Sequence, residues 1–199
     1  MKRSNLDRGW LFKYTNSIMG VANKFDSEEH EVDLPHDFTI HTDPSPDAPG
    51  VRTTGYYRNG CGHYRKTFAV PADVRGKRVL AEFDGAFMNA CITINRNQVA
   101  THHYGYSPFH VDLTKYLNFG GENVLEVQIN NSAEPNTRWY SGSGLYRHVD
   151  LLSAPKLHIA PWGIYAYTER VGADGTAIVH VELSVVNDSD EDADVHAFI

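Results

Sequence analysis

The stretch Leu125-Glu126-Val127-Gln128-Ile129-Asn130 alternates strictly between apolar and polar residues. Successive side chains of an extended chain point to opposite faces, so this period of two predicts a half-buried β-strand. The same alternation recurs at residues 79–83, 90–94, 149–151 and 179–185. No stretch repeats apolar residues with the period of a helix, apart from one or two turns expected around residues 113–117. The sequence therefore predicts an all-β fold.

Turn signals separate these strands and mark a domain boundary near residue 155. Runs at 75–77, 95–97 and 120–123 are spaced as in a β-sandwich or jelly roll, and Asp174-Gly175 is a typical hairpin turn. Pro155 and Pro161 bracket the start of the next strand. We expect residues 1–155 to form one domain. Residues 156–199 offer about three strands, so we expect a truncated immunoglobulin-like β-sandwich there, because the complete one takes about seven.

Charge, cysteine content and hydropathy exclude several classes of function. The formal net charge of −7 argues against a nucleic-acid partner, because such binding depends on clustered Lys and Arg. Cys61 and Cys91 are too few for a disulfide framework and lie in no metal-ligand spacing. We expect two buried thiols in a cytoplasmic protein, with no metal and no cofactor. No run approaches the ~20 apolar residues of a membrane span, so no membrane partner is expected either.

Six short blocks follow one another in a distinctive order. They are Leu34-Pro35-His36-Asp37-Phe38, Tyr64-Arg65-Lys66-Thr67-Phe68, Phe83-Asp84-Gly85, Tyr106-Ser107-Pro108-Phe109, Gly121-Glu122-Asn123-Val124-Leu125 and Arg138-Trp139-Tyr140-Ser141-Gly142-Ser143-Gly144-Leu145-Tyr146-Arg147. In order and spacing this set resembles the N-terminal sugar-binding domain of family 2 glycoside hydrolases of the β-galactosidase type. The resemblance implies a galactose-binding-domain-like jelly roll, followed from about residue 157 by the immunoglobulin-like module of those enzymes.

The resemblance also implies where the chemistry takes place. Retaining glycosidases use two carboxyl groups about 5 to 5.5 Å apart, and in the resembled family both are glutamates of a TIM barrel that follows the two β modules. We therefore expect no catalytic residue in this chain. Its expected partners are a carbohydrate, a β-galactoside, bound in the context of the full enzyme, the C-terminal barrel, and further copies of the parent in a homo-oligomer.

Four residues are candidates for contact with the substrate. Asn59 stands where β-galactosidases of the resembled family offer an Asn to the galactose subsite, although an Asn in a Gly-rich turn also has structural uses. Arg138 stands where some of them place an Asp that holds galactose and a sodium ion, so a cation replaces an anion. Its guanidinium suits hydroxyls or a carboxylate, and a structural salt bridge is the alternative. Trp139 and Tyr140 offer aromatic faces for stacking on a pyranose, with packing against the barrel or the sandwich core as the favoured alternative.

Two further features bear on the local structure. His36 and Asp37 are adjacent in an extended segment and so point in opposite directions, which favours a structural role over a catalytic pair. Asn95-Arg96 replaces the Asn-Gly that the resembled family usually has in a hairpin. This departure predicts a longer connection that extends through Asn97.

The sequence leaves several readings of the function open. β-Glucuronidase and β-mannosidase are sister specificities of β-galactosidase that these residues do not separate. A free-standing carbohydrate-binding module is a second reading, and it would require several exposed aromatic residues on one rim. A third is a purely architectural domain that supports the barrel and subunit contacts, for which an exposed apolar patch would be evidence.

Overall fold

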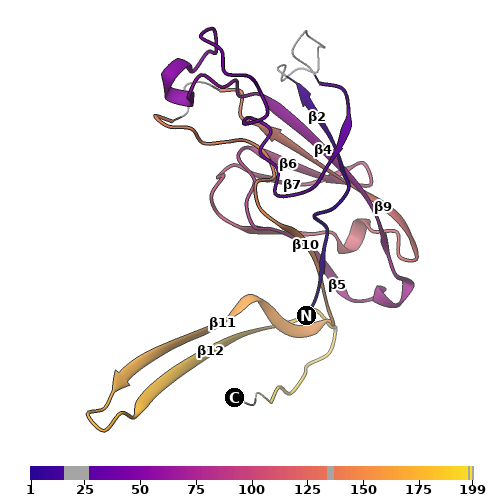
Figure 1. The fold of residues 1–199 in the computed structure, drawn as a ribbon. Helices are drawn as coiled ribbons and strands as arrows, with labels where there is room; N and C mark the ends of the chain where they lie inside the picture. Colours follow the sequence, from indigo (N-terminus) through magenta and orange to yellow (C-terminus); the bar gives the residue numbers. More distant parts are fainter. Residues whose placement is uncertain (16–26, 134–136, 197, 199) are drawn as a thin grey trace.

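The computed structural model describes residues 1–15, 27–133, 137–196 and 198. Two antiparallel sheets pack face to face as a β-sandwich (Figure 1). The larger sheet has the order β3 (His30–Val32), β2 (Trp10–Thr15), β4 (Cys61–Val70), β9 (Gly121–Asn130), β6 (Ala90–Ile94) and β7 (Asn97–His102). The smaller has the order β1 (Lys2–Asn5), β10 (Val149–Ala154), β5 (Arg78–Phe83) and β8 (Phe109–Asp112). The predicted all-β sandwich is confirmed.

The core lies between the two sheets and follows the alternation of the sequence. On β9 the side chains of Leu125, Val127 and Ile129 are at most 1% exposed. Val79 and Phe83 of β5 are buried in the same core cluster. Each such side chain contributes about 1.5–3 kcal/mol by leaving water. The core thus holds the two sheets together and fixes the ends of the strands from which the loops emerge.

Helical structure in the described residues is limited to short 3₁₀ turns. These turns are η1 (Val51–Thr54), η2 (Ala72–Val74) and η3 (Thr114–Tyr116). The helical turn predicted around residues 113–117 is therefore confirmed, as a single 3₁₀ turn.

The connection between β6 and β7 differs from the expected one. Ile94 pairs directly with Asn97, so the loop consists of Asn95 and Arg96 alone. Their φ angles of 47° and 69° are those of a type I′ turn. The Asn95 side chain secures this turn by donating to Tyr116 O and accepting from Val124 N, at 2.7 and 2.9 Å. The prediction of a longer connection was wrong, because these side-chain bonds hold a conformation that Arg96 alone would disfavour.

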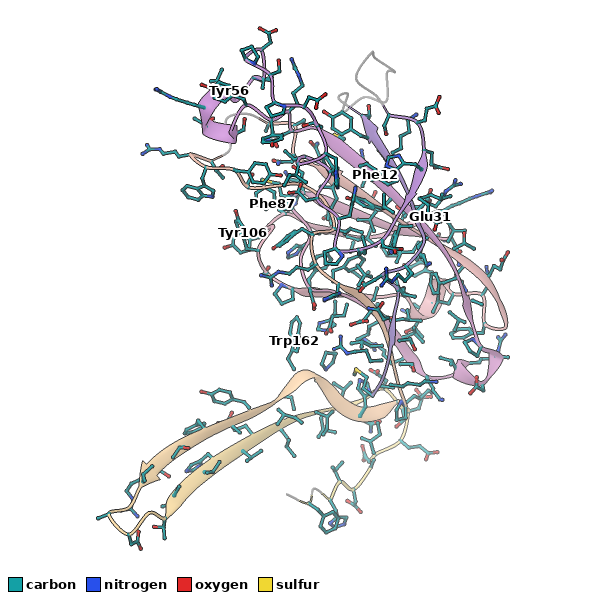
Figure 2. All side chains as sticks on the ribbon, in the orientation of Figure 1. Phe12, Glu31, Tyr56, Phe87, Tyr106 and Trp162 are labelled. Atoms are coloured by element: carbon teal, nitrogen blue, oxygen red, sulfur yellow. The ribbon has the colours of Figure 1, made fainter. Side chains whose placement is uncertain are left out.

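Beyond the sandwich, β11 (Leu157–Val171) and β12 (Ala177–Asn187) form a long hairpin around the predicted Asp174-Gly175 turn (Figure 1). The expectation of half-buried strands is wrong here: both strands are largely exposed, with Ile164 at 61% and Val179 at 56%. The hairpin touches the sandwich where Trp162 packs on His110 (Figure 2), with ring centroids 4.1 Å apart. That residues 156–199 belong to an immunoglobulin-like domain stays a prediction.

The structure also tests the expectations for the two cysteines and for membrane-spanning helices. Both cysteines are free thiols, Cys61 buried and Cys91 only partly so, which corrects the expectation of two buried thiols. None of the helices in the described ranges has the length and apolar character needed to cross a membrane.

Candidate functional site

Two long loops meet at one end of the sandwich, and Asp37 joins them. The first loop leads from β3 to β4 and contains η1, and the second leads from β9 to β10 (Figure 1). Asp37 Oδ1 accepts hydrogen bonds from the backbone N–H groups of Thr39 and Ser143, at 3.0 and 2.8 Å. Asp37 Oδ2 accepts a hydrogen bond from the Tyr140 hydroxyl at 2.6 Å. One carboxylate therefore ties together segments that lie about a hundred residues apart in sequence.

Asn59 belongs to the same network but lies inward. It is 5% exposed. The Thr39 hydroxyl donates to Asn59 Oδ1 at 3.4 Å, and the Tyr14 hydroxyl donates to the Asn59 carbonyl at 3.1 Å. A chain of contacts thus runs from Asn59 through Thr39 and Asp37 to Tyr140. That the Asn59 amide touches a sugar stays a prediction.

Tyr140 is held as a hydrogen-bond donor at the edge of the site. Its ring meets that of Tyr57 edge to face, with centroids 5.4 Å apart. Partial burial and the adjacent carboxylate of Asp37 raise the pKa of the Tyr140 phenol well above its ordinary value. The phenol therefore keeps its proton at any physiological pH, and 37% of the residue remains exposed for a partner.

Arg138 and Trp139 project from the same loop into solvent. Trp139 is 62% exposed, so it does not pack in the sandwich core. Within the described ranges, Arg138 is exposed and takes part in no ion pair. Both side chains are therefore available to a ligand or a docking surface beside Tyr140. Whether they contact a sugar stays a prediction.

The structure adds exposed aromatic residues that the sequence reading did not select. Tyr56, Tyr104 and Tyr106 are 44%, 63% and 44% exposed, and Figure 2 shows Tyr56 and Tyr106 on the same side of the sandwich. The loop of Tyr104 and Tyr106 is joined to the second loop because the Tyr146 hydroxyl donates to Gly105 O at 2.8 Å. We call Tyr56, Tyr104, Tyr106, Trp139 and Tyr140 the aromatic rim. In the sequence, Tyr104-Gly105-Tyr106 repeats an aromatic residue within a loop, but this pattern alone does not show that the two rings are exposed.

The chemistry of these loops is that of recognition. Aromatic faces stack on the apolar faces of sugar rings, and the polar groups beside them bond hydroxyls. Asp37 already accepts three hydrogen bonds and so acts as an anchor for the loops. In the described chain no group of three or more His, Cys, Asp and Glu side chains could hold a metal ion. The adjacent His102 and His103 bond different partners, Ser107 and Asn89.

Comparison with known proteins places this architecture in a family. A family model described as "Glycosyl hydrolases family 2, sugar binding domain" matches residues 4–155. The β-galactosidase BoGH2A of Bacteroides ovatus is 37% identical over 195 residues, which are 98% of this chain and 23% of that protein. A β-glucuronidase of Bacteroides fragilis is 28% identical over 83% of this chain and 23% of its own length.

Solved structures agree with the sequence matches. The crystal structure of a β-glycosidase from Bacteroides vulgatus superposes with a TM-score of 0.85 at 28% identity, covering 96% of this chain and 25% of that one. The chain therefore spans about a quarter of the length of these relatives. The chain belongs to glycosyl hydrolase family 2, and residues 4–155 are its sugar-binding domain.

Proposed function

We propose that this chain is the non-catalytic part of a β-galactosidase and that its end loops supply one wall of the pocket for the non-reducing sugar. The observation that carries the proposal is the hydrogen-bonded chain from Asn59 through Asp37 to Tyr140, beside the exposed Trp139. It gathers polar groups and aromatic faces on loops anchored to a rigid sandwich. The relative BoGH2A, named a β-galactosidase, supports the choice of sugar.

Hydrolysis itself requires a further part of the enzyme in this proposal. The two carboxyl groups of a retaining mechanism would come from a TIM barrel, with the aromatic rim facing it. The chain alone is therefore expected to bind sugar weakly and to hydrolyse nothing. Release of p-nitrophenol from p-nitrophenyl β-galactoside by the purified chain would contradict this division of labour.

A β-glucuronidase is the second candidate, and Arg138 favours it. The Arg138 guanidinium is exposed and forms no ion pair with the residues that the structure describes, so it can offer two parallel N–H donors to a uronate carboxylate. The named β-glucuronidase of Bacteroides fragilis shows that such enzymes are among the relatives. A β-mannosidase remains a third specificity without an observation of its own.

An NMR titration separates these candidates. The chain would be titrated with the methyl β-glycosides of galactose, glucuronic acid and mannose, following the amide signals of Asn59, Arg138 and Tyr140. We expect a dissociation constant on the order of millimolar for the galactoside, because a site shared with a barrel loses contacts without it. Selective binding of the glucuronide that is lost in Arg138→Gln would instead support a β-glucuronidase.

The remaining outcomes decide between the other classes of function. If no sugar moves these signals up to about 100 mM, the sugar contact is wrong and the architectural reading stands. If a glycan binds the chain alone with a dissociation constant of about 10 µM or less, the free-standing binding module is the better description. Trp139→Ala should weaken either kind of binding, whereas the exposed Asp73→Asn in η2 should not.

We also propose a reducing compartment, the cytoplasm, for the enzyme. Cys61 and Cys91 are free thiols, as expected where disulfides do not persist. Titration of the native protein, purified without reductant, should find two free thiols after unfolding. A homo-oligomeric parent stays a prediction that sedimentation of the full enzyme would test.

A further inference from the structure

The hairpin of β11 and β12 is attached to the sandwich at its base. Only Pro155 and Lys156 separate β10 from β11. Arg78, the first residue of β5, forms an ion pair at 2.8 Å with Asp188, which directly follows β12. Arg78 also pairs in register with Ala154, the last residue of β10, so this ion pair lies beside the connection. Both attachments therefore hold the hairpin at one end and leave its angle to the sandwich unfixed.

A cavity of about 540 Å³ lies between the hairpin and the sandwich next to this base. Its lining includes Glu82 and Leu152 of the sandwich and Ile159 and Ile164 of β11. Ile159 and Ile164 remain 41% and 61% exposed, so no continuous apolar interface joins the two units there. Units joined without a large hydrophobic interface are expected to move relative to each other. A fixed angle between them requires a further contact.

A wide bulge in β11 carries Trp162 out of the hairpin ladder. The pairing of β11 with β12 shifts between Ile159 and Ile164, where four residues of β11 stand opposite Ser184 alone. A Cβ atom on Gly163 would lie 2.9 Å from Ser184 O, so the return of the bulge to the ladder requires glycine. Trp162 itself has a φ angle of 54°. A bulky residue in this left-handed region is a strained outlier, so the bulge holds a tryptophan at a position that suits glycine.

His110 of β8 offers the Trp162 ring a fixed platform on the sandwich. Its Nε2 bonds Glu82 Oε2 at 2.5 Å, and the other carboxylate oxygen of Glu82 pairs with Arg3 of β1. The centroids of the Trp162 and His110 rings lie 4.1 Å apart, with their planes inclined by 55°. Figure 2 shows Trp162 between the hairpin and the sandwich. Trp162 remains 61% exposed, so this is a single ring contact that one substitution can remove.

We propose that Trp162 is a strut that fixes the angle between the sandwich and the hairpin. The bulge projects its ring beside the cavity, and the contact with His110 stops the hairpin from pivoting about its base at Pro155 and Lys156. Strained residues persist where the surrounding structure over-determines them, and they are typical of positioning and switch regions. In the enzyme proposed above, this angle would set the position of the barrel relative to the aromatic rim. The strut itself does not depend on that proposal.

Residual dipolar couplings of the weakly aligned chain measure this angle in solution. In the unmodified chain, couplings from the sandwich and from the hairpin should fit one alignment tensor, with an order parameter of about 0.85 for the hairpin relative to the sandwich. Trp162→Ala should lower this order parameter below about 0.6. Trp162→Gly removes the same ring and relieves the strained backbone, so hydrogen exchange should show β11 and β12 still paired while the order parameter falls equally. Trp162→Phe keeps a ring and should keep the fixed angle.

Tyr165→Ala is the matched control. Tyr165 is 60% exposed on the same strand, and its ring packs on Tyr167 with centroids 5.4 Å apart, so its removal should leave the order parameter of the hairpin unchanged. The proposal is overturned if Trp162→Gly keeps the order parameter of the unmodified chain, or if the unmodified chain already lies below about 0.6. It is equally overturned if the hairpin of Trp162→Phe is as mobile as that of Trp162→Ala. No sugar enters these measurements, so failure of the pocket wall proposed above does not affect them.

Discussion

Replacement of Asp37 by Ala should loosen both loops of the site at once. Alanine removes the acceptor for two backbone N–H groups and for the Tyr140 hydroxyl. A hydrogen bond to a charged group contributes roughly 1.5–3 kcal/mol, but Asp37 is partly exposed and water can replace some of the lost contacts. We therefore expect the free energy of unfolding to fall by about 3 kcal/mol for the three bonds together. For a domain of this size the melting temperature should fall by roughly 6–12 °C.

Two milder variants divide this loss. Asp37→Asn keeps an oxygen for the two N–H groups and should cost about 1 kcal/mol. Tyr140→Phe removes only the phenol bond and should also cost about 1 kcal/mol. In a double-mutant cycle, Tyr140→Phe should cost almost nothing once Asp37→Ala is present, which gives a coupling of about 1 kcal/mol.

Urea unfolding followed by circular dichroism measures these differences through the transition midpoint. The exposed Asp73→Ala in η2 is the control and should stay within about 0.5 kcal/mol of the unmodified chain. The anchoring role of Asp37 is refuted if Asp37→Ala also stays within that limit, or if the cycle shows no coupling with Tyr140.

Three further variants test other parts of the fold. Gly144→Ala should lower the free energy of unfolding by about 3 kcal/mol or more, because the added Cβ would lie 2.5 Å from the Tyr64 hydroxyl oxygen. Gly76 also has a positive φ, but no atom lies within 4 Å of its Cβ position, so Gly76→Ala should cost only about 1–2 kcal/mol. Thermal unfolding measures both. Arg96→Gly should raise the free energy of unfolding by about 1 kcal/mol in urea, because glycine suits φ of 69°, and Arg96→Ala should bring no such gain. A hydrogen bond to Asp7 raises the pKa of His148, so the stability from this pair is fully present below about pH 6.5 and is lost as pH rises through the raised pKa. Asp7→Asn should return the His148 pKa, measured by NMR, toward its ordinary value and abolish this loss; an unchanged pKa would contradict the pairing.

The strands were predictable because their signal is local. The alternation on β9 depends only on the geometry of the extended chain, and the buried residues of this strand follow it. The turn at Asn95 and Arg96 was predicted wrongly because its stability depends on side-chain bonds to Tyr116 and Val124, from elements more than twenty residues away. Such partners cannot be recognised before the fold is known.

In the candidate site, too, local features were predictable and contacts between distant segments were not. The predicted boundary near residue 155 placed Asn59 and Tyr140 in one domain, but the contact chain between them runs through Asp37, which lies 106 residues from its partner Ser143. Its role as anchor depends on a loop crossing that no local pattern encodes. Tyr104 and Tyr106 were missed for a related reason, because an aromatic residue in a loop can be buried or exposed with the same sequence around it.

The solvent exposure of a strand's side chains is harder to predict than which of them lie on the same face of the strand. Glu82 is a polar residue on a strand predicted to be half-buried, yet it is 3% exposed, and its carboxylate bonds Arg3 of β1 and His110 of β8. Val179 alternates as regularly as any core residue, yet it is 56% exposed in the hairpin. Alternation states which side chains lie together, whereas burial depends on the element that covers them. A period of two therefore predicts β-strands reliably, but the exposure of each face follows only once the neighbouring strands and loops are placed.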